Sequence, residues 1–89
     1  MAKVFIPLPL QRLTQGNSQL EIEANDVIGV ISKLEKKFPG VEKLIAPGKK
    51  VQPFINIYIN GKDIRFLEGE STVVKDFDEV NIVLAVSGG

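Results

Sequence analysis

Residues 54–61 read Phe-Ile-Asn-Ile-Tyr-Ile-Asn-Gly, and this stretch decides the fold. Isoleucine at every second position is typical of a β-strand that buries one face, so the three isoleucines are expected to point inward. Asn60-Gly61 then favours a tight turn, because both residues tolerate the left-handed backbone that a two-residue hairpin loop needs. A second strand over residues 63–66 completes the predicted hairpin.

Three more segments, nearer the ends of the chain, have patterns that predict strands. Residues 3–8 and 19–23 alternate, and turn-forming residues lie between them at 14–18, which predicts an N-terminal hairpin. Pro7 lacks an amide donor and puts the first strand at a sheet edge or near its own end. Residues 80–86 are almost continuously apolar, which favours a central strand covered on both faces, or on one face by a partner.

One main helix is expected between the two hairpins. Asn25 or Asp26 can cap its start, and Pro39-Gly40 ends it. Apolar residues at helical spacing predict one buried face, formed by Val27, Val30, Ile31, Leu34 and Phe38. Gly29 should cost this helix about 1 kcal/mol relative to Ala, and we attribute it to a close approach between helix and sheet.

The remaining segments are expected to be irregular. Residues 41–45 suggest a short turn, and residues 46–53 an exposed connector rich in breakers. Residues 67–78 are predicted to form a loop that tucks Val73, Val74 and Phe77 inward. The predicted order of elements is strand, strand, helix, strand, strand, strand. This order predicts an α+β chain with the β-grasp arrangement of ubiquitin, a mixed sheet of about five strands packed on one main helix.

Composition narrows the function. The chain has 89 residues, with 11 basic and 11 acidic side chains, and it contains no Cys and no His. A single domain without a basic stripe is not expected to bind nucleic acid, and without Cys or His it lacks the usual side-chain nucleophiles and bases. No apolar run approaches the roughly 18 residues of a membrane span, so a cytoplasmic protein that does not enter a membrane is expected.

The end of the sequence is the strongest candidate for chemistry. We expect a β-grasp domain over residues 1–86 and a flexible Ser-Gly-Gly tail over residues 87–89. A terminal glycine pair arises by chance in about one chain in 200, and frayed termini are common. Even so, Gly88 and Gly89 can thread a narrow channel, and three residues beyond Val86 reach roughly 10 Å. An α-carboxylate is ionised at neutral pH and can attack a phosphate.

Three segments resemble the Gly-Gly sulfur carriers, the family that includes MoaD, the small subunit of molybdopterin synthase, and ThiS, the thiamine sulfur carrier. These segments are residues 54–66, 76–80 and 84–89, and the resemblance spans nearly the whole chain. Together they look most like the CysO branch, which serves cysteine biosynthesis. The resemblance implies a carrier that is not itself an enzyme, whose working group is the carboxylate of Gly89 next to Gly88.

The resemblance also implies the partners. An E1-like adenylating enzyme of the MoeB/ThiF type would use ATP and Mg to activate Gly89, and a sulfurtransferase activity would convert it to a thiocarboxylate. The carrier itself would bind no cofactor and no metal. In the CysO branch the sulfur passes to an activated serine held by a cysteine synthase, and a JAB/JAMM metallopeptidase releases the product.

The acidic residues Asp76, Asp78 and Glu79 lack the spacing of a calcium loop, and we interpret them as turn-forming or solvated.

A docking face is expected on the sheet. If the isoleucines of residues 54–61 face the core, Phe54, Asn56 and Tyr58 face outward, and Phe5 and Val83 are expected to join them. Single exposed apolar side chains are ordinary, whereas a contiguous patch marks a binding surface. The resemblance implies that family members bind activating enzymes through this face. We therefore predict partner binding by Phe5, Phe54, Tyr58, Val83 and Arg65, although solvation alone also explains a charge such as Arg65.

Three alternatives stay open at this stage. The chain resembles the small subunit of molybdopterin synthase closely enough for that role. A ubiquitin-like modifier would use the same adenylate but pass Gly89 to a lysine. The third alternative is a β-grasp interaction module whose terminal glycine pair is accidental. The sequence does not identify the final sulfur acceptor.

Overall fold

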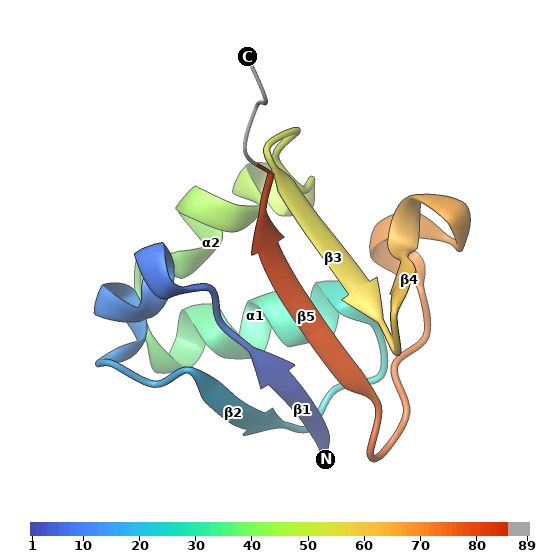
Figure 1. The fold of residues 1–89 in the computed structure, drawn as a ribbon, viewed down its shortest axis with the longest axis horizontal. Helices are drawn as coiled ribbons and strands as arrows, with labels where there is room; N and C mark the ends of the chain where they lie inside the picture. The colour runs from blue at the N-terminus through green and yellow to red at the C-terminus, as the bar shows by residue number, and fades with distance from the viewer. Residues whose placement is uncertain (86–89) are drawn as a thin grey trace.

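The computed structural model describes residues 1–85, and it contains one mixed sheet of five strands in the order β2-β1-β5-β3-β4 (Figure 1). The strands are β1 (Ala2–Phe5), β2 (Gln19–Ile22), β3 (Ile55–Ile59), β4 (Lys62–Asp63) and β5 (Glu79–Leu84). Only β1 and β5 pair in parallel; the other neighbours are antiparallel. The predicted mixed sheet is confirmed, with β5 as its central strand. The expected boundary between residues 1–86 and the tail 87–89 lies outside the described residues.

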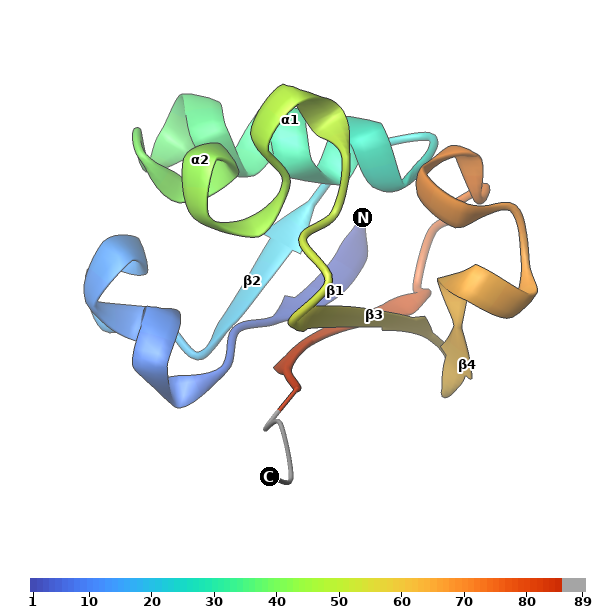
Figure 2. The ribbon, with the colours of Figure 1, turned by 90° about the horizontal axis from the view of Figure 1, so that it is seen from above.

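Two α-helices, α1 (Val27–Lys37) and α2 (Val41–Ile45), lie on one face of this sheet (Figure 2). Short 3₁₀-helices connect the other elements: η1 (Leu8–Thr14), η2 (Pro47–Lys49), η3 (Ile64–Phe66) and η4 (Gly69–Ser71). The opposite face of the sheet, which we call the open face, carries exposed side chains such as Lys3 and Val83. The helices therefore leave one broad surface of the sheet available.

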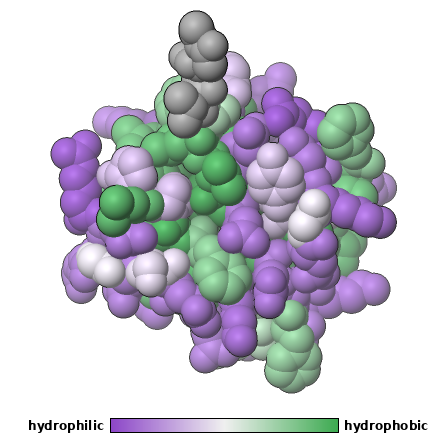
Figure 3. Space-filling view, viewed as in Figure 1, coloured by the Kyte–Doolittle hydropathy of each residue, from purple (hydrophilic) through white to green (hydrophobic). Residues whose placement is uncertain are grey.

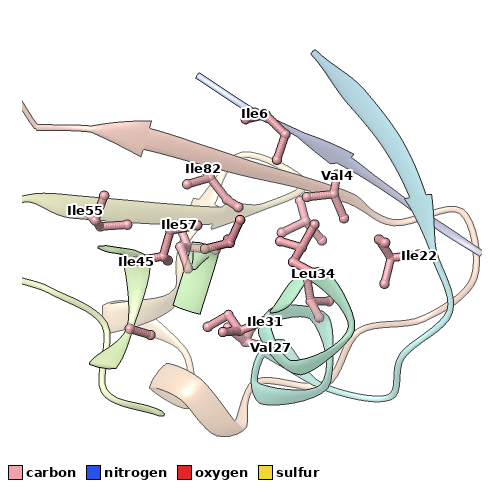
Figure 4. Packing of buried hydrophobic residues seen from close by; sticks show 14 of the residues in the cluster. Val4, Ile6, Ile22, Val27, Ile31, Leu34, Ile45, Ile55, Ile57 and Ile82 are labelled. Atoms are coloured by element: carbon pink, nitrogen blue, oxygen red, sulfur yellow. The ribbon is translucent and has the colours of Figure 1, made fainter. Parts of the chain in front are cut away.

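The core fills the space between the sheet and the helices (Figure 4). The alternating isoleucines of β3 are all buried, as predicted. The helix contributes the face expected from its spacing, namely Val27, Val30, Ile31, Leu34 and Phe38. Burying each large aliphatic side chain stabilises the fold by about 1.5–3 kcal/mol, so this layer supplies most of the driving force. The sequence pattern and the packing agree throughout this layer.

Helix α1 starts at a side-chain cap. Asp26 Oδ1 accepts a hydrogen bond of 2.7 Å from the Gly29 amide, which satisfies one of the free amides of the first turn. A Cβ at Gly29 would lie 3.1 Å from this oxygen and 3.2 Å from the Ala24 Cβ. Gly29 therefore makes room for the cap and for the residues before the helix, and our attribution of it to contact with the sheet is wrong.

We expect Asp26→Ala to lower the free energy of unfolding by about 1 kcal/mol, because the Gly29 amide loses its acceptor. Urea denaturation followed by circular dichroism measures this loss. Asp26→Asn keeps an acceptor oxygen at the same place and should recover most of the stability. Equal losses in both variants would mean that the cap is not the source of the effect.

Several local expectations are corrected. The first strand ends at Phe5 rather than at residue 8, and Pro7 caps η1, which the sequence reading missed. The strand predicted over residues 63–66 ends at Asp63, because its carboxylate accepts the Arg65 amide at 2.8 Å and turns the chain into η3. Residues 41–45 form α2 instead of a simple turn.

The loop before β5 also differs from the prediction. Only Val74 is buried, whereas the side chains of Val73 and Phe77 are 55% and 85% exposed. Val73 forms an isolated bridge with Asp26, and neighbours in an extended chain point to opposite sides, so burial of Val74 turns Val73 outward. Phe77 has a φ of 70° in the turn that leads into β5. The backbone of this turn, not hydrophobicity, sets the direction of its side chains.

Candidate functional site

The open face brings the predicted docking residues together through strand register. Phe5 pairs with Asn81 across β1 and β5, and Asn81 pairs with Tyr58 across β5 and β3. Val83 pairs with Asn56 in the next register position. Paired residues of neighbouring strands point to the same side, so these residues form two adjacent rows on the open face.

Apolar and aromatic side chains gather on this face (Figure 3). Phe54 and Val83 are 45% and 39% exposed, and Phe5 and Tyr58 are half-buried. We call these four residues the open-face patch. Their common location is a structural fact, and their role in partner binding remains a prediction.

Arg65 lies at one margin of the open face. Its Nη2 atom is 2.8 Å from Asp63 Oδ2 and also donates to Asn56 Oδ1, which ties the guanidinium to the outward residues of β3. The hydrogen bonds from Arg65 hold the pKa of the Asp63 carboxyl below its usual range. The Arg65 side chain is still 61% exposed, against 11% for Asp63. A positive charge is therefore held in place and remains accessible beside the patch.

The chain leaves the sheet next to the same patch. Leu84 pairs with Ile55, and the Ala85 amide donates a hydrogen bond of 2.7 Å to the Phe54 carbonyl. Ala85 is the last described residue. Gly88 and Gly89, the predicted reaction site, lie outside the described residues. What the structure does establish is that the approach to the tail begins at the open-face patch.

The acidic residues before β5 have local structural partners. Asp78 accepts hydrogen bonds from the Lys75 amide and from Asn60 Nδ2, and Asp76 lies 2.8 Å from the amino group of Met1. Their interpretation as turn and surface residues is confirmed. Within residues 1–85, no three His, Cys, Asp or Glu side chains are grouped so as to hold a metal ion. No helix in this range has the length and apolar character to cross a membrane.

Comparison with known proteins identifies the family of this chain. The model of the ThiS family matches residues 4–89. The chain belongs to the ThiS family. This ThiS-family chain is 38% identical to the sulfur carrier protein CysO of Mycobacterium tuberculosis over 89 residues, which cover 97% of this chain and 96% of the relative. The resemblance seen in the sequence is confirmed.

Solved structures of similar ThiS-like chains confirm the β-grasp fold. A chain in the crystal structure of the Amycolatopsis orientalis BexX/CysO complex is 34% identical, with a TM-score of 0.93 and complete coverage of both chains at 100%. Small archaeal modifier protein 1 from Methanosarcina acetivorans is 36% identical, with a TM-score of 0.84, and the match covers 99% of this chain and 95% of the other. The relatives are small carriers and modifiers rather than catalysts.

Sequence reasoning placed Asn56 on the outward side of its strand but missed Asn81 and Asp63, the other polar residues that organise the open face. Asn81 and Asn56 lie between the patch residues, and Asp63 holds Arg65. A signal for Asn81 exists, because it is the only polar residue in the apolar stretch 80–86. A lone polar residue in such a strand marks the side that faces away from the core. The Asp63–Arg65 pair has no comparable signal in the sequence.

We expect the stability of the fold to decrease as the pH falls below about 4.5. Hydrogen bonds from backbone amides lower the pKa of Glu35 and Glu70 from 4.5, and side-chain hydrogen bonds lower that of Asp63 and Asp78 from 3.8. As the pH falls, the unfolded chain therefore binds more protons than the folded chain. The contribution of these carboxyl groups to stability is fully present above their ordinary pKa values, and it is lost as the pH falls through their lower pKa values in the folded chain. Urea midpoints measured from pH 7 to pH 3 test this; a constant midpoint would contradict it.

Proposed function

We propose that this chain carries sulfur as a thiocarboxylate on the α-carboxyl carbon of Gly89. A carboxylate oxygen of Gly89 attacks the α-phosphorus of ATP and displaces pyrophosphate, which gives an acyl-adenylate. A sulfide sulfur then attacks the acyl carbon and displaces AMP, which leaves the thiocarboxylate. The net change on the carrier is one oxygen replaced by one sulfur. ATP and Mg belong to an E1-like partner of the MoeB/ThiF type.

The observation that carries this proposal is the 38% identity to a CysO sulfur carrier over 97% of the chain. Two further facts support it. The ThiS family match extends to residue 89, and the chain contains no Cys or His that offers a competing nucleophile. The place where β5 ends, beside the exposed open-face patch, suits a tail that enters the active site of another protein.

Cysteine is the product that we propose for the transferred sulfur. In this scheme the thiocarboxylate sulfur forms a bond to Cβ of an activated serine held by a cysteine synthase, and the activating group leaves, which joins Gly89 to cysteine as a thioester. The cysteine amino group then attacks the acyl carbon and displaces the thiolate, which gives an amide bond. A metallopeptidase of the JAB/JAMM type then releases cysteine from the tail and regenerates Gly89. The similarity to CysO supports this branch.

Intact-mass spectrometry tests the proposal directly. Incubation with ATP, Mg, a sulfur donor and an E1-like adenylating enzyme of the MoeB/ThiF type should convert the carrier to a form with one oxygen exchanged for sulfur. Addition of a cysteine synthase and its activated serine should then consume this form. Absence of the first exchange would overturn the carrier proposal, and exchange without consumption would overturn only its assignment to cysteine.

A second candidate function is protein modification. The support is the 36% identity to small archaeal modifier protein 1 of Methanosarcina acetivorans. A modifier would join Gly89 to lysine side chains through an isopeptide bond. Because Lys75 is the last trypsin site in the sequence, tryptic digests of cells that produce the chain would then contain lysines bearing a remnant of residues 76–89 that depends on this gene. Their absence would leave the carrier as the better function.

We expect Val83→Asp to lower the kcat/KM for adenylation of the carrier by about tenfold or more, because it puts a charge into the centre of an apolar binding surface. Pyrophosphate exchange with the activating enzyme measures this value. Val73→Asp is the matched control, since Val73 is an exposed valine outside the open face and should change kcat/KM by less than about twofold. Equal losses in both variants would contradict docking through the open-face patch.

A further inference from the structure

Strand β2 has an unpaired edge. It is the first strand in the sheet order, and within residues 1–85 only β1 pairs with it. The Ile6 amide donates to the Ser18 carbonyl, whereas the Lys3 amide donates to the Asp78 carbonyl on the other side of β1. Because antiparallel pairs alternate, Leu20 and Ile22 direct their backbone groups towards β1. The amide and carbonyl of Glu21 therefore point out of the sheet.

The other edge of the sheet, strand β4, offers fewer backbone groups to an added strand. Strand β4 is only two residues long and runs directly into η3, whereas β2 has four residues and contains neither a proline nor a bulge. Short, interrupted edges are a common protection against added strands. Among the described residues, β2 is thus the longer and more regular template for an additional strand.

A shallow cavity of about 420 Å³ lies between this edge and helix α1. Its helix side is formed by three exposed lysines, Lys33, Lys36 and Lys37, and its strand side by Glu21, Ile22 and Glu23. None of the three lysines has an ion-pair partner within residues 1–85. We call this cavity and its strand edge the β2–α1 groove.

The two sides of an added strand would meet different charges. Ile22 is buried on the helix side of β2, and Glu21 is exposed on the opposite side. Alternate residues of an added strand would therefore face the lysines, and the residues between them would face Glu21. Acidic side chains fit the positions that face the lysines, and uncharged side chains fit the positions that face Glu21.

A second copy of this chain fits the groove poorly. Two β2 strands paired antiparallel about a two-fold axis would put both α1 helices on the same side of a continuous sheet. Lys33, Lys36 and Lys37 would then meet their own symmetry mates, and juxtaposed like charges oppose association. Charge complementarity selects an acidic partner instead.

We propose that the β2–α1 groove binds an extended acidic segment of another protein, which adds to β2 as a sixth strand. Backbone hydrogen bonds at Glu21 provide the pairing, and the three lysines provide the selectivity. The groove lies near the start of β5 and away from its end: Glu21 pairs with Lys3, and Lys3 with Glu79 at the start of β5. Leu84 is five residues further along this strand, roughly 17 Å at the rise of a β-strand. A partner can hold the carrier here while the tail reacts elsewhere.

A synthetic heptapeptide tests the groove, acetyl-Thr-Glu-Thr-Glu-Thr-Glu-Thr-amide. Its glutamates are spaced to face the lysines, and its threonines favour an extended strand. Titration into isotope-labelled carrier to about 1 mM, followed by NMR, should shift the amides of Gln19, Glu21 and the α1 lysines. The same peptide with lysine for glutamate should not bind, and one with N-methylated amides on its pairing edge should bind at least about tenfold more weakly.

Charge reversal identifies the lysines as the selective element. The double variant Lys33→Glu, Lys37→Glu should weaken peptide binding by at least about tenfold, and binding to the native carrier should fall with salt. The matched control is Lys49→Glu, Lys50→Glu, an exposed pair outside the groove, which should change affinity by less than about twofold. Absence of binding at about 1 mM, shifts centred on the open-face patch, or equal effects of both double variants would each overturn the proposal.

Discussion

Removal of Gly89 should abolish the oxygen-for-sulfur exchange completely. The reacting atoms in the proposed cycle are the α-carboxyl group of this residue, and a chain that ends at Gly88 presents its carboxylate one residue short of the position that the activating site reaches. One residue spans about 3.5 Å, and a misplacement of about 1 Å already costs about a hundredfold in rate. Intact-mass spectrometry of the carrier after incubation with its activating enzyme measures the result.

The fold should be unaffected by this deletion, since β5 ends at Leu84, which is also the last described residue packed against the core. Circular dichroism and urea denaturation of the shortened chain check this directly. Ser87→Ala serves as the control within the tail, because we assign no chemical role to Ser87, and it should retain exchange within about twofold. Sulfur exchange on the chain without Gly89 would refute its carboxylate as the carrier group.

Leu34→Ala should produce the largest loss of stability among the substitutions considered. Leu34 is fully buried on the helix face that packs against the sheet. Truncation removes apolar contacts and leaves a cavity, which costs about 3 kcal/mol. In a domain of this size such a loss lowers the melting temperature by about 15 °C. Calorimetry and urea denaturation measure both quantities.

Leu8→Ala is the matched control for this substitution. Leu8 is 78% exposed at the start of η1, so its truncation should change the free energy of unfolding by less than about 0.5 kcal/mol. A small effect at Leu34 would mean that the packing between helix and sheet is less tight than the burial indicates. A large effect at Leu8 would place that side chain against the core.

The repeating parts of the fold were predictable from the sequence. The alternation in residues 54–61 predicted the buried face of β3, and Asn60 and Gly61 have the positive φ values of 50° and 88° expected from their turn. Helical spacing identified the buried face of α1, and Asp26 was one of two expected caps. These features depend on neighbours in sequence, which is why a single sequence reveals them.

The features that depend on distant contacts were not predictable. Phe77 is exposed because its turn is held by Asp78 and by a hydrogen bond from its own amide to the Met1 carbonyl. The edge position of β2, and hence the β2–α1 groove, follows only from the order of strands. For the candidate site, alternation predicted which side chains share the open face, whereas the ties of Arg65 to Asp63 and Asn56 required the structure.

The central position of β5 has a consequence for the synthesis of this protein. Because β5 is the last of the five described strands in sequence and lies between β1 and β3, the two hairpins belong to one sheet only after β5 has been synthesised and has paired with both. Nascent and prematurely terminated chains therefore lack the surface on which Phe5 and Tyr58 lie side by side with Asn81. In the proposed cycle, an activating enzyme that docks on this surface would therefore not recognise chains that lack β5.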